Sequence, residues 1–172
     1  MILGLDISTS ITGVTVIDCS GKIDYNFAID TRKYKSFFDK VEVVKARLET
    51  IITDPEKIYI EQSLQSFRSG FSSARTLSTL SRFNGAVSWI CYEIWGLEPE
   101  YIAATSARKL AGIKVPKGQK AKKCVIEYVI DNVPDVLIEY TKHGNPKPHC
   151  YDTADSWVIA RAGWLDCQKK KN

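Results

Sequence analysis

At the beginning of the chain, the apolar and polar positions follow the pattern of three short strands. Residues 2–7 are an apolar run ending in an acid, residues 13–19 are rich in β-branched side chains, and residues 22–29 follow a Ser-Gly turn. β-branched runs bounded by short polar segments favour strands, and short connections favour antiparallel pairing. We therefore predict an antiparallel three-stranded meander.

The next segment changes to helical periodicity. Apolar side chains recur every three or four positions in residues 36–52, which predicts an amphipathic helix, and residues 57–62 again resemble a strand. A helix that connects two strands makes a crossover, so this fourth strand should lie parallel to a neighbour. Residues 63–73 are polar apart from two phenylalanines, and we expect a loop there.

The rest of the chain is predicted to be mainly helical, with Gly and Pro at the ends of elements. We predict helices at 74–95, 105–111, 120–132 and 151–167, a strand at 100–104, and loops at 113–119 and 141–150. The order β-β-β-α-β-α-β-α-α-α indicates an α/β fold with a mixed sheet. We place one domain at residues 1–168 and expect a disordered basic tail at residues 169–172.

Composition excludes several classes of protein. The 172 residues are 44% hydrophobic and 26% charged, as in an ordinary globular domain, and no apolar run approaches the roughly 18 residues that span a membrane. Five cysteines without a C-x-x-C motif indicate neither a disulfide framework nor a zinc ribbon. We expect a cytoplasmic protein with no membrane partner and no small-molecule cofactor.

Four acids stand at positions that suggest chemistry. Asp6 and Glu61 end two apolar strands, in ILGLDIS and IYIEQS, and a crossover topology could bring them to one edge of the sheet. Asp152 and Asp155 are three residues apart, so they share one helix face, in the first turn of the predicted helix. Individually, the first two could satisfy turns and the last two could cap a helix.

Together these acids predict a metal site. Carboxylate oxygens suit Mg²⁺ or Mn²⁺ rather than Zn²⁺, and two such ions roughly 3.5–4 Å apart can activate water and stabilise the leaving oxygen in phosphodiester cleavage. The net charge is +4, and it would rise to about +8 if metal neutralised four carboxylates. A basic surface around an acidic site suits an enzyme that acts on a polyanion.

Six segments together carry a resemblance to a known family: LGLDISTSITGVTVID, IYIEQS, RTLSTLSRFNGAV, TSARKLAG, KGQKAKKCVIEYV and DTADSWVIA, in this order. The chain resembles the RuvC-type Holliday junction resolvases of the ribonuclease H-like nuclease superfamily over nearly its whole length. Its shortness and divergence suggest a phage or viral member, which would act in the host cytoplasm.

The resemblance implies a ribonuclease H-like fold, with a five-stranded mixed sheet (three antiparallel strands plus two parallel) flanked by helices. It implies that Asp6, Glu61, Asp152 and Asp155 are catalytic and bind two Mg²⁺ ions, with Mn²⁺ as a substitute. It further implies a homodimer for DNA recombination and repair. Each subunit would nick one of two opposed strands of a four-way junction, leaving 5′-phosphate and 3′-hydroxyl ends.

Basic residues near the expected site are candidates for DNA binding. They are Lys117, Lys120, Lys122 and Lys123, at the start of a predicted helix. Together with backbone N–H groups they could bind a phosphate, or they could be ordinary solvent-exposed charges. By resemblance, Lys109 and Lys122 match DNA-contacting lysines of the family.

Further candidates lie in and after the 63–73 loop. Arg68, Arg75 and Arg82 recur every seven residues and could follow phosphates along a DNA arm, or be ordinary exposed helix charge. The resemblance suggests that Phe67 wedges into the opened junction, where stacking would contribute roughly 1–3 kcal/mol. Alternatively, Phe67 folds back onto the core.

The helix at 74–95 is a candidate for the dimer interface. It carries more apolar side chains than one core needs, and the resemblance implies that it packs against the second subunit, although an ordinary core helix would have the same composition. The residues concerned are Leu77, Leu80, Ala86, Val87 and Ile90, with the small residues Ser78, Ser81 and Gly85.

Three other functions would each fit part of the sequence. An actin-like or sugar-kinase ATPase shares the first hairpin, but such proteins need a second domain and a second Gly-rich loop, which this chain lacks. The complete set of acids argues against a junction-binding protein without activity. A nuclease with the same chemistry on flaps, forks or RNA–DNA hybrids is left open.

Overall fold

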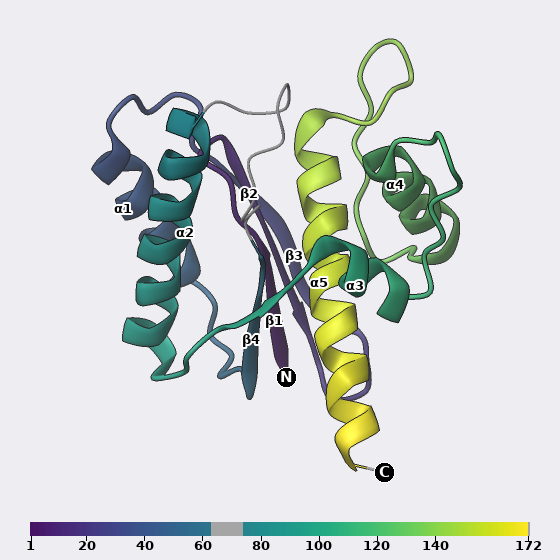
Figure 1. The fold of residues 1–172 in the computed structure, drawn as a ribbon, viewed down its shortest axis with the longest axis horizontal. Helices are drawn as coiled ribbons and strands as arrows, with labels where there is room; N and C mark the ends of the chain where they lie inside the picture. Colours follow the sequence, from purple (N-terminus) through teal and green to yellow (C-terminus); the bar gives the residue numbers. More distant parts are fainter. Residues whose placement is uncertain (63–73, 172) are drawn as a thin grey trace.

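In the computed structural model, the described residues 1–62 and 74–171 form a five-stranded sheet with helices on both faces (Figure 1). The strands are β1 (Ile2–Asp6), β2 (Ile11–Ile17), β3 (Ile23–Asp30), β4 (Lys57–Glu61) and β5 (Glu100–Ile102). The helices are α1 (Phe37–Leu48), α2 (Ala74–Trp95), α3 (Ala104–Leu110), α4 (Ala121–Asn132) and α5 (Pro148–Lys171). Elements follow one another in the predicted order.

The sheet has the strand order β3-β2-β1-β4-β5. β1, β2 and β3 pair in antiparallel fashion, as the predicted meander requires. β4 lies parallel to β1, and β5 lies parallel to β4. The mixed sheet of three antiparallel and two parallel strands is therefore confirmed, including the crossover that makes β1 and β4 neighbours.

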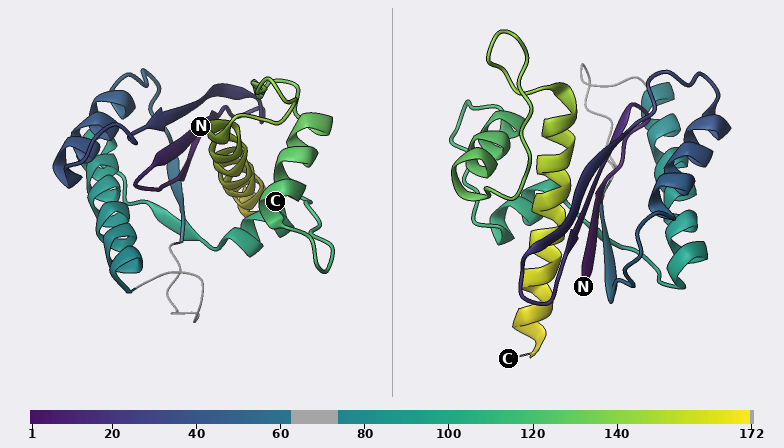
Figure 2. Two further views of the ribbon diagram at one scale, coloured as in Figure 1. Left: turned by 90° about the horizontal axis from the view of Figure 1, so that it is seen from above. Right: turned by 180° about the vertical axis from the view of Figure 1, so that it is seen from behind.

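Helices cover the two faces of the sheet unequally (Figure 2). On one face, alternate residues of the central strands, such as Leu3, Leu5 and Ile60, pack against α1 and α2 in a core with Phe83 and Val87. On the other face, α5 lies along β1 and β2, with α3 and α4 packed outside it (Figure 1). Because side chains alternate along a strand, the residues between those core positions all face α5.

The second strand begins and ends two residues earlier than predicted, because side chains close both turns early. The Ser8 hydroxyl accepts a hydrogen bond from the Ile11 backbone N–H at 3.1 Å, which ends the first turn. The Asp18 carboxylate accepts from the backbone N–H groups of Ser20 and Lys22 at 2.8 and 2.9 Å, so the chain already turns at Asp18.

The last helix is longer than predicted. α5 begins at Pro148 rather than near residue 151, and it continues to Lys171 through the segment expected to be a tail. Proline is well tolerated in the first turn of a helix, where its missing N–H has no partner to lose. Of the helices in the described parts of the chain, none combines the length and apolar character needed to cross a membrane.

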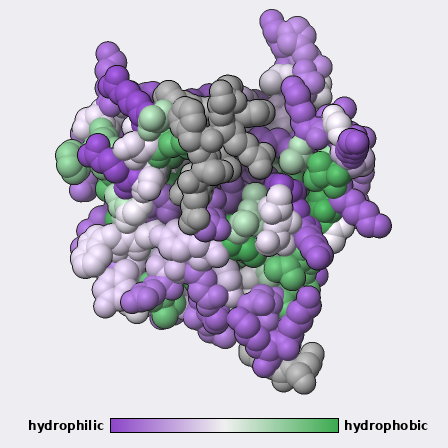
Figure 3. All heavy atoms as spheres, viewed as in Figure 1, coloured by the Kyte–Doolittle hydropathy of each residue, from purple (hydrophilic) through white to green (hydrophobic). Residues whose placement is uncertain are grey.

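The hydropathy of the surface is uneven. Hydrophilic side chains cover much of the face seen in Figure 3, and apolar side chains come to the surface in separate patches. Such scattered apolar exposure is usual for globular proteins.

Candidate active site

Asp6 and Glu61 lie next to each other at the end of the two central parallel strands. Leu5 pairs with Ile60 in the β1–β4 ladder, so the next positions along both strands are those of the two acids. Leu5 and Ile60 point into the core on the face covered by α1 and α2. Because successive side chains of a strand point to opposite faces, Asp6 and Glu61 point toward the face covered by α5. The crossover thus brings together two acids that are distant in the sequence.

Helix α5 carries Asp152 and Asp155 to the same edge. Their side chains are 14% and 13% exposed. The helix approaches closely because β2 has glycine at position 13, where a Cβ atom would lie only 1.9 Å from the backbone oxygen of Asp152. The predicted position in the first turn is wrong: the helix starts at Pro148, and no acid lies in its first turn. This removes the basis for reading the pair as helix caps.

Asp6, Glu61, Asp152 and Asp155, here called the acidic cluster, influence one another electrostatically. Burial, followed by the negative charges of Glu61 and Asp155, raises the pKa of Asp6 well above its usual range. Burial and the charge of Asp155 likewise raise the pKa of Glu61. For Asp152 and Asp155, burial is the main reason for a raised pKa. The cluster is therefore a partly desolvated site with an excess of negative charge.

Lys122, at the start of α4, partly compensates this charge. Its Nζ lies 3.4 Å from Asp152 Oδ1 and 3.6 Å from Asp155 Oδ2. Desolvation of the ammonium lowers the pKa of Lys122, but the charges of Asp152, Asp155 and Asp6 outweigh it and raise the pKa overall. A lysine predicted as a DNA contact thus faces the acids in the structure.

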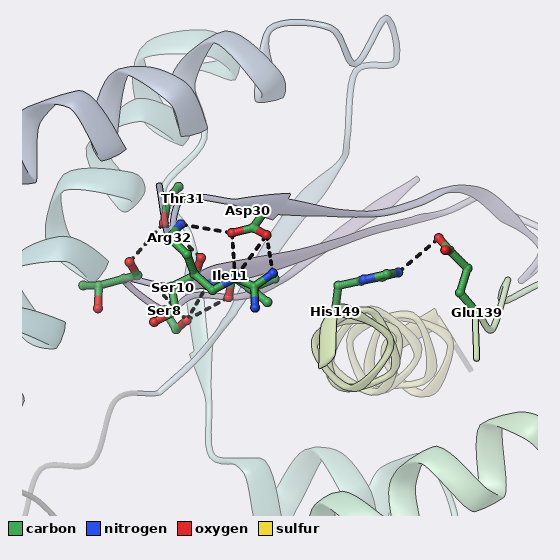
Figure 4. A network of polar contacts seen from close by, with 9 residues as sticks. Ser8, Ser10, Ile11, Asp30, Thr31, Arg32, Glu139 and His149 are labelled. Atoms are coloured by element: carbon green, nitrogen blue, oxygen red, sulfur yellow. Dashed lines mark hydrogen bonds and ion pairs between the residues drawn. The ribbon is translucent and has the colours of Figure 1, made fainter. Parts of the chain in front are cut away.

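Two further basic residues act on Asp152, and each of them contacts an acid of its own (Figure 4). Arg32 Nε donates to Asp30 Oδ1 at 3.0 Å, and this pairing lowers the pKa of Asp30 to about 2. His149 Nε2 lies 3.2 Å from Glu139 Oε1. Both groups oppose the rise of the Asp152 pKa. Nothing in the sequence pattern pointed to Arg32 beyond an Asp-x-Arg spacing at the end of a strand.

The donor set of the acidic cluster fits a hard divalent cation. All donors are carboxylate oxygens, and their raised pKa values reflect a charge that a cation would neutralise. Within residues 1–62 and 74–171, no three His, Cys, Asp or Glu side chains are grouped tightly enough to hold a metal ion. The Lys122 ammonium occupies space between two of the four acids.

The other predicted DNA contacts that the structure describes lie on α2, on α3 and near the start of α4. Lys109, Lys117 and Lys120 are exposed on α3 and around the start of α4, and Arg75 is exposed in the first turn of α2. Lys123 pairs with Glu127, with 3.6 Å between Nζ and Oε1. Phe67 and Arg68 lie outside the described residues.

The prediction that Val87 and Ile90 of α2 belong to a dimer surface is wrong. Val87 and Ile90 are 0% and 3% exposed, so they belong to the core of the chain itself and cannot meet a second subunit. The outer face instead presents Trp89 and Tyr92, which are 65% and 45% exposed. Their ring centroids are 5.7 Å apart. Neither was among the residues predicted for the interface.

Comparison with known proteins defines the fold. No family model matches the sequence, and no curated protein matches it either. The structure is similar to Thermus thermophilus RuvC in complex with a Holliday junction substrate, with a TM-score of 0.65, 15% identity, and coverage of 98% of this chain and 94% of the other.

Two more solved structures are similar over the same 98% of this chain. A second structure of Thermus thermophilus RuvC has a TM-score of 0.63 at 19% identity and 96% coverage of that chain. The yeast mitochondrial Holliday junction resolvase Ydc2 has a TM-score of 0.56 at 15% identity and 80% coverage. The chain thus has the RuvC-type, ribonuclease H-like fold that its sequence predicted.

Proposed function

We propose that this protein is a divalent-metal-dependent endodeoxyribonuclease that cuts branched DNA, with four-way junctions as its main substrate. The observation that supports this best is the meeting of four carboxylates from β1, β4 and α5 at one edge of a RuvC-type fold. Strands and a long helix carry the acids, so the backbone positions from which the four carboxylates extend are fixed by the fold.

The acidic cluster would hold two Mg²⁺ ions, or Mn²⁺ in their place. Bound there, such ions lower the pKa of a water nucleophile and neutralise charge on the leaving oxygen. The side chains of Asp6 and Glu61 are directed at the site by rigid strands. Asp152 and Asp155 close it from the helix side, and Lys122 offsets part of the charge and can contact a phosphate of the bound strand.

Basic residues around the site are proposed to bind the DNA backbone. The residues concerned are Lys109 on α3 and the lysines at 117, 120, 122 and 123, of which Lys122 lies beside Asp152 and Asp155. Arg75, together with Phe67 and Arg68, is proposed to contact the DNA at the junction. Phosphate contacts of this kind orient a duplex and make its affinity strongly dependent on salt.

We further propose a homodimer, because symmetric resolution of a four-way junction requires two active sites. The exposed aromatic pair of Trp89 and Tyr92 on α2 is a suitable contact, since aromatic side chains are enriched in interfaces. Its exposed area would be covered by the same surface of a second copy in a two-fold arrangement.

One experiment tests the proposal directly. The protein is incubated with labelled four-way junction, fork, flap, RNA–DNA hybrid and linear duplex, in Mg²⁺, in Mn²⁺ and in EDTA, and the cuts are mapped. We expect metal-dependent, paired nicks at the centre of the junction, with 5′-phosphate ends. Equal cutting of forks, flaps or hybrids would point to a broader nuclease of the same chemistry. ATP hydrolysis without DNA cleavage would overturn the proposal.

A further inference from the structure

A buried chain of hydrogen bonds joins β2, β3 and α5. The hydroxyls of Thr15 on β2 and Ser156 on α5 lie 2.8 Å apart, and both residues are 0% exposed. The Ser156 hydroxyl also donates to the Thr153 backbone oxygen at 2.9 Å. From the strand side, the Asn26 amide of β3 donates to Thr15 Oγ1 at 2.7 Å and to the Thr153 oxygen at 3.2 Å. Elements that are distant in the sequence are therefore connected by one polar network.

The directions of these hydrogen bonds follow from the number of hydrogens. A hydroxyl donates one hydrogen bond and can accept two. Since Ser156 donates to the Thr153 oxygen, it must accept from Thr15, and Thr15 in turn accepts from Asn26. The bonds thus run from Asn26 through Thr15 and Ser156 to the backbone of α5. Removing either hydroxyl would deprive a buried polar group of a partner.

The glycine contacts of α5 set its distance from the sheet rather than its rotation. A Cβ atom at position 13 would lie 1.9 Å from the Asp152 backbone oxygen, and one at position 4 would lie 2.4 Å from the Ala160 backbone nitrogen. Gly4 is paired with Thr15 in the β1–β2 ladder, so the hydroxyl stands beside this smooth surface. A hydrogen bond is directional, and the one from Thr15 to Ser156 therefore favours one angle of the helix about its axis.

The rotation of α5 decides where its acids point. Asp155 directly precedes Ser156, and Asp152 lies four residues before it, about one helical turn away. Any turn of the helix carries both carboxylates with it, toward or away from Asp6 and Glu61 on the strands. Functional sites need side chains placed to within about 0.5 Å and 10–20°. A contact that fixes this rotation therefore has consequences for the whole acidic cluster.

We propose that the Thr15–Ser156 hydrogen bond fixes the rotation of α5. In this way it directs the carboxylates of Asp152 and Asp155 toward the divalent cations that the acidic cluster would bind. The inference rests on the proposed function and deepens it by naming two positioning residues. Both side chains are buried, so they act through the backbone of α5 and not on the substrate.

The test compares metal affinity with stability. Calorimetry measures Mn²⁺ binding without DNA, and thermal melting in EDTA measures stability. Thr15→Val keeps the shape of the side chain but removes the hydrogen bond, and we expect Mn²⁺ to bind about tenfold more weakly, as for other residues that orient metal ligands. Thr15→Ser keeps the hydroxyl, so it should bind Mn²⁺ nearly as wild type does, although it loses a buried methyl group.

Variants on the helix side test the same bond. Ser156→Ala is compatible with folding, because alanine favours helix. Thr15→Val, Ser156→Ala and the double variant all lack the same hydrogen bond, so the three should have the same reduced Mn²⁺ affinity. The double variant leaves neither hydroxyl without its partner, so it should melt no lower than the less stable single variant. Losses of affinity that add up in the double variant would overturn the inference.

Val16→Ala is the matched control for stability. Val16 is the next residue of β2, is 1% exposed, and packs in the core on the opposite face of the sheet. Its truncation should lower Tm and leave Mn²⁺ affinity unchanged. A folded Thr15→Val or Ser156→Ala protein with the Mn²⁺ affinity of wild type would overturn the inference. So would a Val16→Ala protein that loses as much Mn²⁺ affinity as Thr15→Val.

The outcome also separates this inference from the proposed function. If wild type binds Mn²⁺ and nicks the junction while Thr15→Val binds Mn²⁺ equally well, the positioning role is wrong and the nuclease function stands. If wild type binds Mn²⁺ without cutting DNA, the nuclease function fails, and the Mn²⁺ affinities still decide the positioning role. A wild-type protein that binds no Mn²⁺ would overturn both.

Discussion

Gly13 lies directly against Asp152: a Cβ atom at position 13 would be 1.9 Å from the Asp152 backbone oxygen and 3.1 Å from the Ser156 Cβ. In the β1–β2 ladder, Gly13 is also paired with Asp6. One contact between β2 and α5 thus sets how far the strand acids lie from the helix acids. Glycine is needed here for space, since its φ is not positive.

Replacing this glycine should therefore separate the two halves of the acidic cluster. In Gly13→Ala the methyl group forces α5 away from β2, and we expect a loss of stability of about 1–3 kcal/mol in urea unfolding, as for other overpacked sites. Nicking of the junction should fall more than the loss of folded protein explains. Gly85→Ala is the control for stability, because nothing lies within 4 Å of that position and alanine favours helix. A Gly13→Ala protein with wild-type stability and activity would show that the contact does not set the site.

Asp6→Asn should abolish cutting without abolishing DNA binding. The substitution removes a carboxylate ligand and one negative charge while keeping the shape of the side chain. We expect the nicking rate to fall by roughly 10²-fold or more, and junction affinity in EDTA to be equal or higher. Asp131→Asn, which changes an exposed acid of α4, serves as the control. Loss of junction binding in folded Asp6→Asn would contradict the assignment of Asp6.

Divalent metal should stabilise the protein, with an effect that depends on pH. The raised pKa values of Asp6 and Glu61 mean that the folded state holds their protons more tightly than the unfolded state. Without metal, stability from these groups is present at low pH and is lost as pH rises through the folded pKa values. Ligand binding at about 100 times Kd contributes about 2.7 kcal/mol, or roughly 5–10 °C in Tm, and the gain should be larger at pH 8 than at pH 5. Calorimetry with Mg²⁺, Mn²⁺ and EDTA measures both effects, and an unchanged Tm at millimolar metal would count against the site.

Lys122→Gln should make the protein more dependent on metal. Removal of the ammonium beside Asp152 and Asp155 leaves more of their repulsion uncompensated, so Tm in EDTA should fall and the gain on adding Mn²⁺ should increase. Lys123→Gln is the neighbouring control, because its side chain is 70% exposed and pairs with Glu127 on the helix surface. Equal metal-induced shifts in the two variants would mean that Lys122 does not offset the charge of the cluster.

Trp89→Glu should weaken self-association. A charge placed in the exposed aromatic pair on α2 would have to be desolvated in a two-fold contact, where it also meets its own copy. Light scattering coupled to size exclusion should show a dimer for wild type and a monomer for the variant. Phe38→Glu, at a similarly exposed aromatic site on α1, is the control. A wild-type protein that stays monomeric at high concentration would refute the homodimer.

Local patterns in the sequence determined much of this protein. Alternation of period two and the 3.6-residue helical period are properties of neighbouring residues, so they revealed the order of elements and the mixed sheet. The same patterns placed Asp6 and Glu61 at strand ends, and the spacing of Asp152 and Asp155 put them on one helix face. The ends of the elements were predicted less accurately than their order. The start of α5 at Pro148, for example, is set by a proline in the first turn and not by the spacing of apolar residues.

Only the tertiary structure decided which groups meet. Periodicity records that a face is buried but not which element buries it, so the inward position of Val87 and the exposure of Trp89 could not be read from α2 alone. The position of Lys122 next to Asp152 and Asp155 depends on how α4 packs against α5. Charges act through space, and the distances between them exist only once the chain has folded.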